Sequence, residues 1–209
     1  MEERKRKSLQ CEIYHRLASM NCARIRQKCG VISFTNEAYE ALVIFHENSL
    51  MELSIEDKKT GQIPFYLHFE ARDPQSAGSH IQAFFEFFKA KNRAEEQLDV
   101  EAAKVSRPMK LLVSCTSGLT SSYFAYTMQN ALEKTGIDIT IDAVSYTEID
   151  RLEGQYDYIL LAPQIAYKLP EYRQKYGDKV MAVDSRDFAS YDVNRVINRL
   201  VRFTGVSVA

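Results

Sequence analysis

The stretch from Met109 to Ser122, which reads MKLLVSCTSGLTSS, constrains the fold of this chain more than any other. Its apolar run ends at Cys115, and small or hydroxylated residues follow before a helical pattern begins. This order is typical of a strand, a tight turn and a helix. In an open α/β sheet ligands bind at the carboxyl ends of the strands, and helix N-termini attract anions. A thiol held there has a lowered pKa, so the pattern indicates a nucleophilic thiolate beside an anion site.

Short apolar runs alternate with helical periodicity from residue 109 onward. We predict strands at 110–114, 139–144, 158–161 and 180–183. We predict helices at about 120–134, 147–152, 163–176 and 191–203. Apolar strands joined by helices pair in parallel and are buried on both faces. The C-terminal half is therefore predicted to be α/β, a three-layer sandwich around a four-stranded parallel sheet.

The N-terminal half has a different pattern. An apolar stripe of Leu9, Ile13 and Leu17 predicts a helix over 8–28 that stops near Gly30. Thr35-Asn36-Glu37 predicts the cap of a short helical turn. Asp73-Pro74 predicts the start of a further helix, whose apolar face carries Ile81, Phe84, Phe85 and Phe88.

Strict alternation of apolar and polar residues predicts half-buried strands at 51–56 and 63–70, with a third strand at 42–45. Pro64 predicts an edge position or the start of its strand. We therefore expect two domains: an α+β domain over residues 1–100, with helices on an antiparallel sheet, and the α/β domain over 109–209. The boundary is predicted at 98–108.

Composition excludes several classes of protein. The 209 residues carry a net charge of −1, which gives no support for a surface that binds nucleic acid or an anionic membrane. No long apolar stretch predicts a signal or membrane anchor, so we expect a cytoplasmic protein with its four cysteines reduced. We expect no cofactor. A metal cluster is not expected either, because Cys11, His15, Cys22 and Cys29 match no standard zinc spacing. The remaining histidines are predicted to be strand or helix-surface residues: His46, His68 and His80.

Two segments carry a resemblance to a known family. Residues 115–122, CTSGLTSS, resemble the phosphocysteine loop of the lactose/cellobiose-class IIB subunits of the sugar phosphotransferase system (PTS). Residues 157–170, DYILLAPQIAYKLP, resemble the third strand and following loop of that family. The resemblance covers about residues 109–200 and leaves the N-terminal half unrecognised. There are departures: Ala162 replaces a usual glycine, Lys168 replaces an apolar residue, and residues 188–191 replace a tyrosine-glycine segment.

The resemblance implies a phosphoryl carrier with a IIB fold. The Cys115 thiolate would take phosphate from a phosphohistidine on a IIA partner, and the phosphate would pass to a sugar at a membrane IIC subunit. The loop residues implied to bind phosphate are Thr116, Ser117, Gly118, Leu119, Thr120, Ser121 and Ser122. Pro163, Gln164 and Tyr167 form a possible second loop; the alternative is that Tyr167 only packs its helix.

A cysteine-dependent phosphatase is disfavoured, because the arginine that it needs six positions after the cysteine is Ser121 here. Two other functions stay open. The IIB-like domain could instead sense PTS phosphorylation and signal through the N-terminal domain, or it could be a scaffold that has lost transfer. The sequence names neither the sugar, nor the oligomeric state, nor the role of the N-terminal domain.

Overall fold

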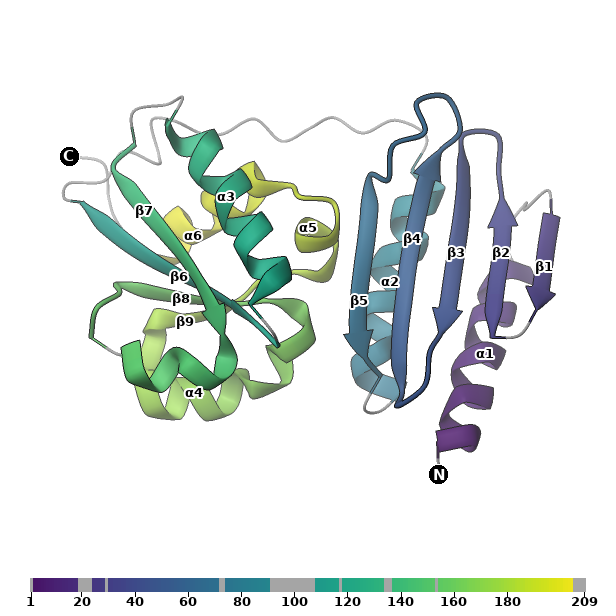
Figure 1. The fold of residues 1–209 in the computed structure, drawn as a ribbon, viewed down its shortest axis with the longest axis horizontal. Coiled ribbons are helices and arrows are strands. Elements are labelled where there is room, and N and C mark those ends of the chain that lie inside the picture. The colour runs from purple at the N-terminus through teal and green to yellow at the C-terminus, as the bar shows by residue number, and fades with distance from the viewer. Residues whose placement is uncertain are drawn as a thin grey trace. The chain divides into compact units, whose positions relative to one another are not determined.

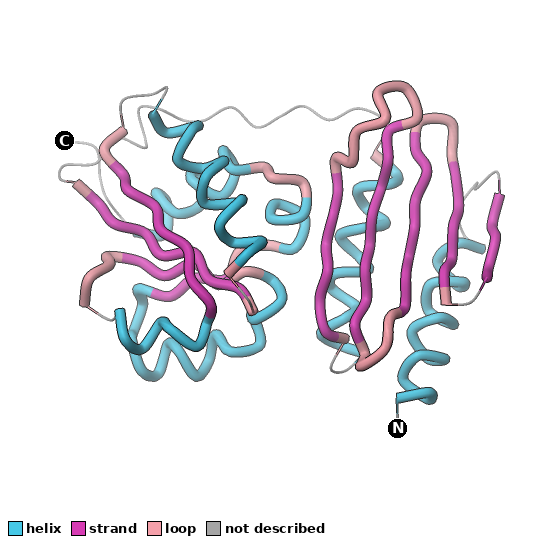
Figure 2. Tube along the Cα trace, in the orientation of Figure 1, coloured by secondary structure: helices cyan, strands magenta, loops and turns pink. Residues whose placement is uncertain are grey.

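The computed structural model describes residues 2–18, 24–28, 30–71, 74–90, 108–116, 118–133, 137–152 and 154–204. The chain divides into two compact units, Met1–Arg93 and Ala94–Ala209. The predicted boundary at 98–108 lies, apart from Pro108, outside the described residues. Each unit has its own sheet (Figures 1 and 2).

Unit 1 is a five-stranded antiparallel sheet with helices on one face. The strands follow chain order: β1 (Arg24–Lys28), β2 (Val31–Thr35), β3 (Tyr39–Phe45), β4 (Leu50–Asp57) and β5 (Phe65–Glu70). The helices α1 (Glu2–Ala18) and α2 (Pro74–Lys89) contact each other and pack on the sheet. The predicted α+β class is confirmed, and so are the strands predicted from alternation. Strand β5 begins directly after Pro64 and lies at the edge, as the proline predicts.

An aromatic cluster forms the core between α2 and the sheet. Phe84 is fully buried, with its ring centroid 5.8 Å from that of Phe34 on β2 and 5.7 Å from that of Phe65 on β5. Phe88 lies 4.9 Å from Phe34. The apolar face predicted for this helix is therefore its buried face. Pro74 opens the helix as expected, whereas Asp73 lies outside the described residues.

Two predictions for the N-terminal half are wrong. The helix predicted over 8–28 ends at Ala18, and Arg24–Lys28 is a strand that pairs with β2 through the turn at Gly30, whose φ is +83°. Pairing with a neighbouring strand outweighs local helix propensity there. The predicted helical turn at 35–39 is a hairpin connection. The Asn36 side-chain oxygen accepts hydrogen bonds from the backbone N–H of Ala38 and Tyr39, at 2.9 and 2.7 Å.

Unit 2 is the predicted three-layer α/β sandwich. Its parallel strands are β6 (Met109–Cys115), β7 (Ile139–Ser145), β8 (Tyr158–Leu161) and β9 (Val180–Ala182), in the order β7-β6-β8-β9. The helices are α3 (Leu119–Glu133), α4 (Leu169–Tyr176), α5 (Ser185–Ala189) and α6 (Val193–Thr204). Three 3₁₀ segments complete it: η1 (Tyr146–Leu152), η2 (Pro163–Lys168) and η3 (Gly177–Lys179).

The layers of unit 2 place the carboxyl ends of its strands at one edge. On one face α3 contacts β6, β7 and α6. On the other face, a buried cluster joins Leu112 of β6 to Ile149 of η1, Ile165 of η2 and Tyr172 of α4. Helix α5 was not predicted from the sequence; it is five residues long, and Asp184 caps it by accepting a hydrogen bond from the Arg186 N–H at 2.9 Å. The last helix consequently begins at Val193, two residues later than predicted.

Candidate functional site

The Cys115 thiol lies at the carboxyl end of β6, a central strand between β7 and β8. Its Sγ accepts a hydrogen bond from the backbone N–H of Gly118 at 3.2 Å, and it donates to Ser121 Oγ at 3.2 Å. A backbone donor aimed at sulfur stabilises the thiolate relative to the thiol. Cys115 is fully buried in this arrangement.

The hydroxyls of the loop are turned toward the loop itself. Ser121 Oγ and Ser122 Oγ both donate to the carbonyl oxygen of Gly118, at 2.9 and 2.7 Å. Ser121 is buried and touches the sulfur, whereas Thr116, Thr120 and Ser122 lie nearer the surface. The structure describes neither Ser117 nor the Leu119 side chain. The predicted phosphate-binding roles of the loop residues stay predictions.

The neighbouring strand β7 supports the loop through Ser145. Its Oγ donates to the carbonyl oxygen of Thr116 at 3.0 Å and lies 3.1 Å from the Thr147 hydroxyl. Its backbone nitrogen lies only 3.2 Å from the point where a Cβ on Gly118 would stand. Ser145 is a site residue that the sequence reading missed, because its place beside the loop depends on strand order rather than on a motif.

We predict that Gly118→Ala damages the site more than an ordinary left-handed glycine substitution. The residue has a φ of +84°, and a Cβ would press on backbone of β7 that cannot move freely. Gly154 has a φ of +83° with open space around it, so Gly154→Ala is the matched control. In both variants the free energy of unfolding should fall by about 1 kcal/mol, because alanine is disfavoured at a positive φ. Only Gly118→Ala should lose about 1 kcal/mol more and accept phosphate at least about tenfold more slowly. Thermal unfolding and phosphorylation time courses measure both; equal behaviour of the two variants would contradict the close approach to β7.

The possible second loop, η2, follows β8 beside the cysteine strand. The Ala162 N–H donates to the Ser114 carbonyl oxygen at 2.8 Å, which holds the start of this loop against β6. Pro163 and Gln164 are buried, and Gln164 Oε1 has no hydrogen-bond partner among the residues that the structure describes. A buried amide oxygen without a partner is costly and marks a position for a polar contact. Tyr167 is 43% exposed, and its role in a second loop stays a prediction.

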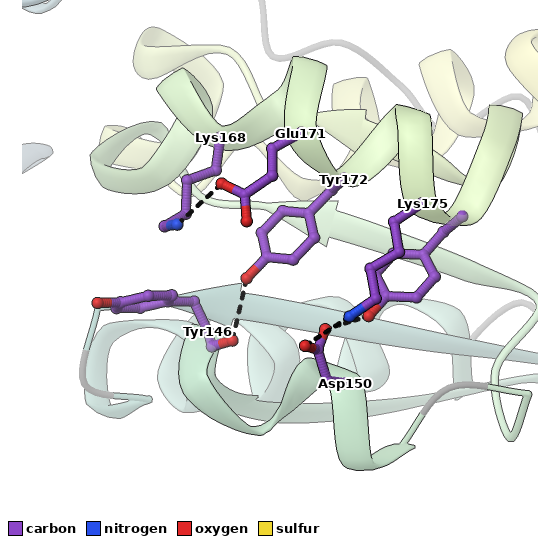
Figure 3. Close-up of polar contacts among 7 residues, drawn as sticks. Tyr146, Asp150, Lys168, Glu171, Tyr172 and Lys175 are labelled. Carbon is purple, nitrogen blue, oxygen red and sulfur yellow. Dashed lines mark hydrogen bonds and ion pairs between the residues drawn. The ribbon is translucent and has the colours of Figure 1, made fainter.

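Lys168, a departure from the family pattern, lies among tyrosine rings (Figure 3). Its Nζ is 3.1 Å from Glu171 Oε2 and lies 5.2 Å from the centre of the Tyr146 ring and 5.7 Å from that of Tyr172. The Tyr172 hydroxyl donates to the Tyr146 carbonyl oxygen at 3.1 Å. Burial is the main cause that raises the pKa of Tyr172, to about 12, so this hydroxyl stays a neutral donor. These contacts fasten η2 and α4 to η1.

A second polar contact joins α4 to η1. Lys175 Nζ lies 2.6 Å from Asp150 Oδ2, and the Tyr176 hydroxyl donates to the other oxygen of the same carboxylate (Figure 3). The hydrogen bond from Lys175, followed by that from Tyr176, lowers the pKa of Asp150. The carboxylate therefore stays ionised at neutral pH and acts as a structural acceptor.

Asp187 on α5 is a buried carboxyl group near the same edge, after β9. Burial, with the Asp184 charge second, raises its pKa to about 6, although Arg195 Nε lies 3.7 Å from Oδ1. Because the folded pKa exceeds the unfolded value, the folded state binds the extra proton between about pH 4 and 6. This group therefore favours folding below pH 4 and loses that contribution as the pH rises through 6.

We predict that Asp187→Asn stabilises unit 2 at pH 7.5 and not at pH 4. A neutral amide removes the cost of burying the carboxylate, which is about 1–3 kcal/mol from the pKa difference. Thermal unfolding of wild type and variant at both pH values measures the effect. If the variant is less stable than wild type at pH 7.5, the attraction between Asp187 and Arg195 outweighs the cost of burying the carboxylate.

The histidines and cysteines of unit 1 are the side chains considered above as metal ligands. Among the described residues, no group of three or more His, Cys, Asp or Glu side chains could hold a metal ion. Cys22 and Cys29 lie outside those residues. His80 was predicted to be at a surface, which is wrong: it is buried, with its ring 4.3 Å from that of Phe69. His46 and His68 lie side by side, 5.8 Å between ring centroids. Of the helices in the described segments, none has the length and hydrophobicity needed to cross a membrane.

A thiol at the carboxyl end of a central parallel strand, inside a loop without lysine or arginine, defines a class of cysteine-based α/β domains. Residues 110–199 match the family model described as the PTS system, lactose/cellobiose-specific IIB subunit. The predicted resemblance over 109–200 is thereby confirmed. It supports a PTS phosphoryl-transfer role in general, and it leaves residues 1–109 outside the match.

Two solved structures are each similar to about half of the chain. One is the lactose-specific IIB component domain of the phosphoenolpyruvate:carbohydrate PTS from Streptococcus pneumoniae, at 22% identity and a TM-score of 0.39. That match covers 47% of this chain and 95% of the other. The second is the cellobiose-specific phosphotransferase IIB component from Borrelia burgdorferi, at 21% identity and a TM-score of 0.41, covering 50% of this chain and 99% of the other.

Proposed function

We propose that unit 2 is a phosphoryl carrier of the sugar phosphotransferase system and that Cys115 is its nucleophile. The observation that carries the proposal is the Gly118 N–H directed at Cys115 Sγ from a loop that adjoins a helix N-terminus, within the segment that matches the IIB family. Cysteine is intrinsically nucleophilic, and a covalent intermediate divides one transfer into two easier ones.

In the first transfer the Cys115 thiolate attacks the phosphorus of a phosphohistidine on a IIA protein. The S–P bond forms while the N–P bond breaks, and the electron pair of that bond stays on the imidazole nitrogen, which takes up a proton. In the second transfer a sugar hydroxyl at a IIC transporter attacks the same phosphorus. The O–P bond forms, the S–P bond breaks with its electrons on sulfur, and the hydroxyl proton is released to a base.

Backbone N–H groups and hydroxyls hold the phosphate in this proposal, because residues 116–122 include no lysine or arginine. The Gly118 N–H and the Ser121 hydroxyl already contact the sulfur and lie where an S-phosphoryl group would start. Backbone amides at a helix N-terminus bind phosphate without a formal charge. Weak stabilisation suits a carrier, which must keep its phosphate until the acceptor arrives.

A regulatory role is the second candidate. It is favoured by the separate core of unit 1, which lies outside the family match and which a simple carrier does not require. In that role, phosphate on Cys115 would signal through unit 1 rather than leave for a sugar.

Reconstituted transfer separates the two candidates. The protein is phosphorylated by phosphoenolpyruvate, the general PTS proteins and a IIA protein, then mixed with membranes that contain a lactose- or cellobiose-class IIC transporter and sugar. The carrier predicts loss of phosphate from the protein and formation of sugar phosphate, both dependent on IIC. Phosphate that stays on the protein with every such transporter and sugar would contradict the carrier role and favour regulation.

A further inference from the structure

Unit 1 contains a pocket between helix α1 and the turn that joins β3 to β4. Its volume is about 390 Å³, at the small end of the range for small-molecule sites. Figure 1 shows the N-terminal end of α1 and this turn at the same end of the sheet. The pocket lies outside the segment that matches the IIB family, and the proposed carrier role does not use it.

The buried residues that line the pocket are all apolar. Leu9 of α1, Met51 of β4 and Ala71 after β5 are each at most 3% exposed. Phe45 of β3 adds an aromatic ring and is 7% exposed. An apolar lining of this kind takes the hydrocarbon part of a ligand out of water, and that transfer is the main source of affinity at small-molecule sites.

Arg6 brings a positive charge to the exposed part of the lining. It lies three residues before Leu9 on α1, so both side chains are on the same helix face. Its guanidinium lies over the Phe45 ring, with Cζ 5.6 Å from the ring centre, and packs against Gly30, where an added Cβ would collide with it. A guanidinium held in one place presents a planar fork of N–H donors that matches a carboxylate.

The β3–β4 turn forms another part of the lining and has a defined shape. Asn48 and Ser49 have φ values of +56° and +61°, and the Leu50 N–H donates to the Glu47 carbonyl oxygen at 3.2 Å. Two successive positive φ values with this hydrogen bond are typical of a type I′ hairpin turn. The Ala71 N–H donates to the Ser49 carbonyl oxygen at 2.8 Å, which fastens the turn to the chain after β5. The pocket is therefore preformed on this side.

The charges of the lining fit a zwitterion. Two of the charged or titratable residues have partners within the protein: Glu3 with Lys7 at 2.9 Å, and His46 with Glu52 at 3.2 Å. Within the described part of the chain, Arg6 and Glu47 form no ion pair. A ligand with a carboxylate and an ammonium group can pair with both, whereas a simple anion is repelled by Glu47. A sugar is disfavoured, because Arg6 covers the Phe45 ring on which it would stack.

We propose that this pocket binds a small α-amino acid with an apolar side chain. The carboxylate pairs with the Arg6 guanidinium and the ammonium group with Glu47, while the side chain packs against Leu9, Met51 and Ala71. Binding here is independent of phosphoryl transfer, and it gives unit 1 a ligand of its own.

The test is a titration of the full chain, followed by calorimetry and by the NMR signals of the backbone amides. The ligands are L-leucine, L-isoleucine, L-valine, L-methionine and L-phenylalanine, with glycine as the amino acid that lacks an apolar side chain. We expect saturable binding of at least one apolar amino acid, with a Kd of about 1 mM or below and at least about tenfold tighter than that of glycine. The amide signals that shift should be those of residues 45–51 and their neighbours in unit 1.

Variants of the two charged residues test the recognition of the amino acid. Arg6→Gln should weaken binding about tenfold or more and Glu47→Gln about three- to tenfold, because hydrogen bonds to charged groups are the strong ones. Arg16→Gln is the matched control. Arg16 also lies on α1 over a phenylalanine ring, 6.0 Å from the centre of Phe85, but it does not line the pocket, so this variant should bind as wild type does.

Two analogues of leucine separate the proposal from its alternatives. Isocaproate lacks the amino group and isoamylamine lacks the carboxylate, and each should bind at least about fivefold more weakly than leucine. Isocaproate that binds as tightly as leucine would overturn the assignment to an amino acid. Saturable binding of none of the five amino acids, or wild-type affinity in Arg6→Gln, would overturn the site itself. Cys115→Ser should bind leucine as wild type does, so the result stands or falls separately from the carrier function.

Discussion

Cys115→Ser should accept phosphate from a IIA donor at least about a thousandfold more slowly than wild type. Serine keeps the size and hydrogen bonds of the side chain, but its hydroxyl is almost fully protonated at neutral pH and is a far weaker nucleophile than a thiolate. The S-phosphoryl group also leaves readily as thiolate, whereas a serine phosphate ester would not pass its phosphate onward. Rates come from intact-mass spectrometry of the protein at successive times after donor is added.

Cys11→Ser is the control for this experiment. Cys11 is an exposed free thiol on α1 of unit 1, so the variant removes a thiol that is more accessible than Cys115. It should be phosphorylated at the wild-type rate. Equal rates for wild type and Cys115→Ser would assign the chemistry to another residue and overturn the proposed function.

Phe84→Ala should destabilise unit 1 by about 3–5 kcal/mol, the largest stability effect that we predict. The ring is fully buried and touches three other phenylalanine rings, on β2, β5 and α2 itself. Its removal leaves a cavity that a well-packed core does not close. A loss of this size is a large share of the stability of a small domain. Urea unfolding followed by hydrogen exchange of the β2–β5 strands measures it.

Ile63→Ala is the matched control, because Ile63 is 54% exposed beside β5 and should change stability by about 0.5 kcal/mol at most. The same two variants test the role of unit 1. If unit 2 is a self-sufficient carrier, Phe84→Ala still accepts phosphate on Cys115 at close to the wild-type rate. If the variant loses both the fold of unit 1 and phosphorylation of Cys115, phosphorylation depends on a folded unit 1.

The sequence predicts unit 2 better than unit 1, and the reason is physical. Strand β8 is found at its predicted bounds, 158–161, because a buried parallel strand is a short apolar run that turn residues bound clearly. In the N-terminal half, Leu9, Ile13 and Leu17 do form the buried stripe of a helix. The segment after it becomes β1 because it pairs with β2, and such pairing leaves little trace in local periodicity.

Some residues of the candidate site could be predicted from the local sequence, and others could not. Cys115 and Ser121 are near each other in the chain, and the motif placed them together; the hydrogen bond between them follows from the tight turn. Ser145 ends β7, and Asp187 lies on α5 after β9, so their places depend on the sheet order β7-β6-β8-β9.

The proposed role of Cys115 is tested by locating the phosphoryl group on the protein. The protein is incubated with phosphoenolpyruvate, the general PTS proteins and a IIA protein, and is then digested under conditions that preserve phosphocysteine. The peptides are sequenced by mass spectrometry. We predict one phosphoryl group per chain, on Cys115. A phosphoryl group on a serine, threonine or histidine instead, or none with lactose- and cellobiose-class IIA donors, would contradict it.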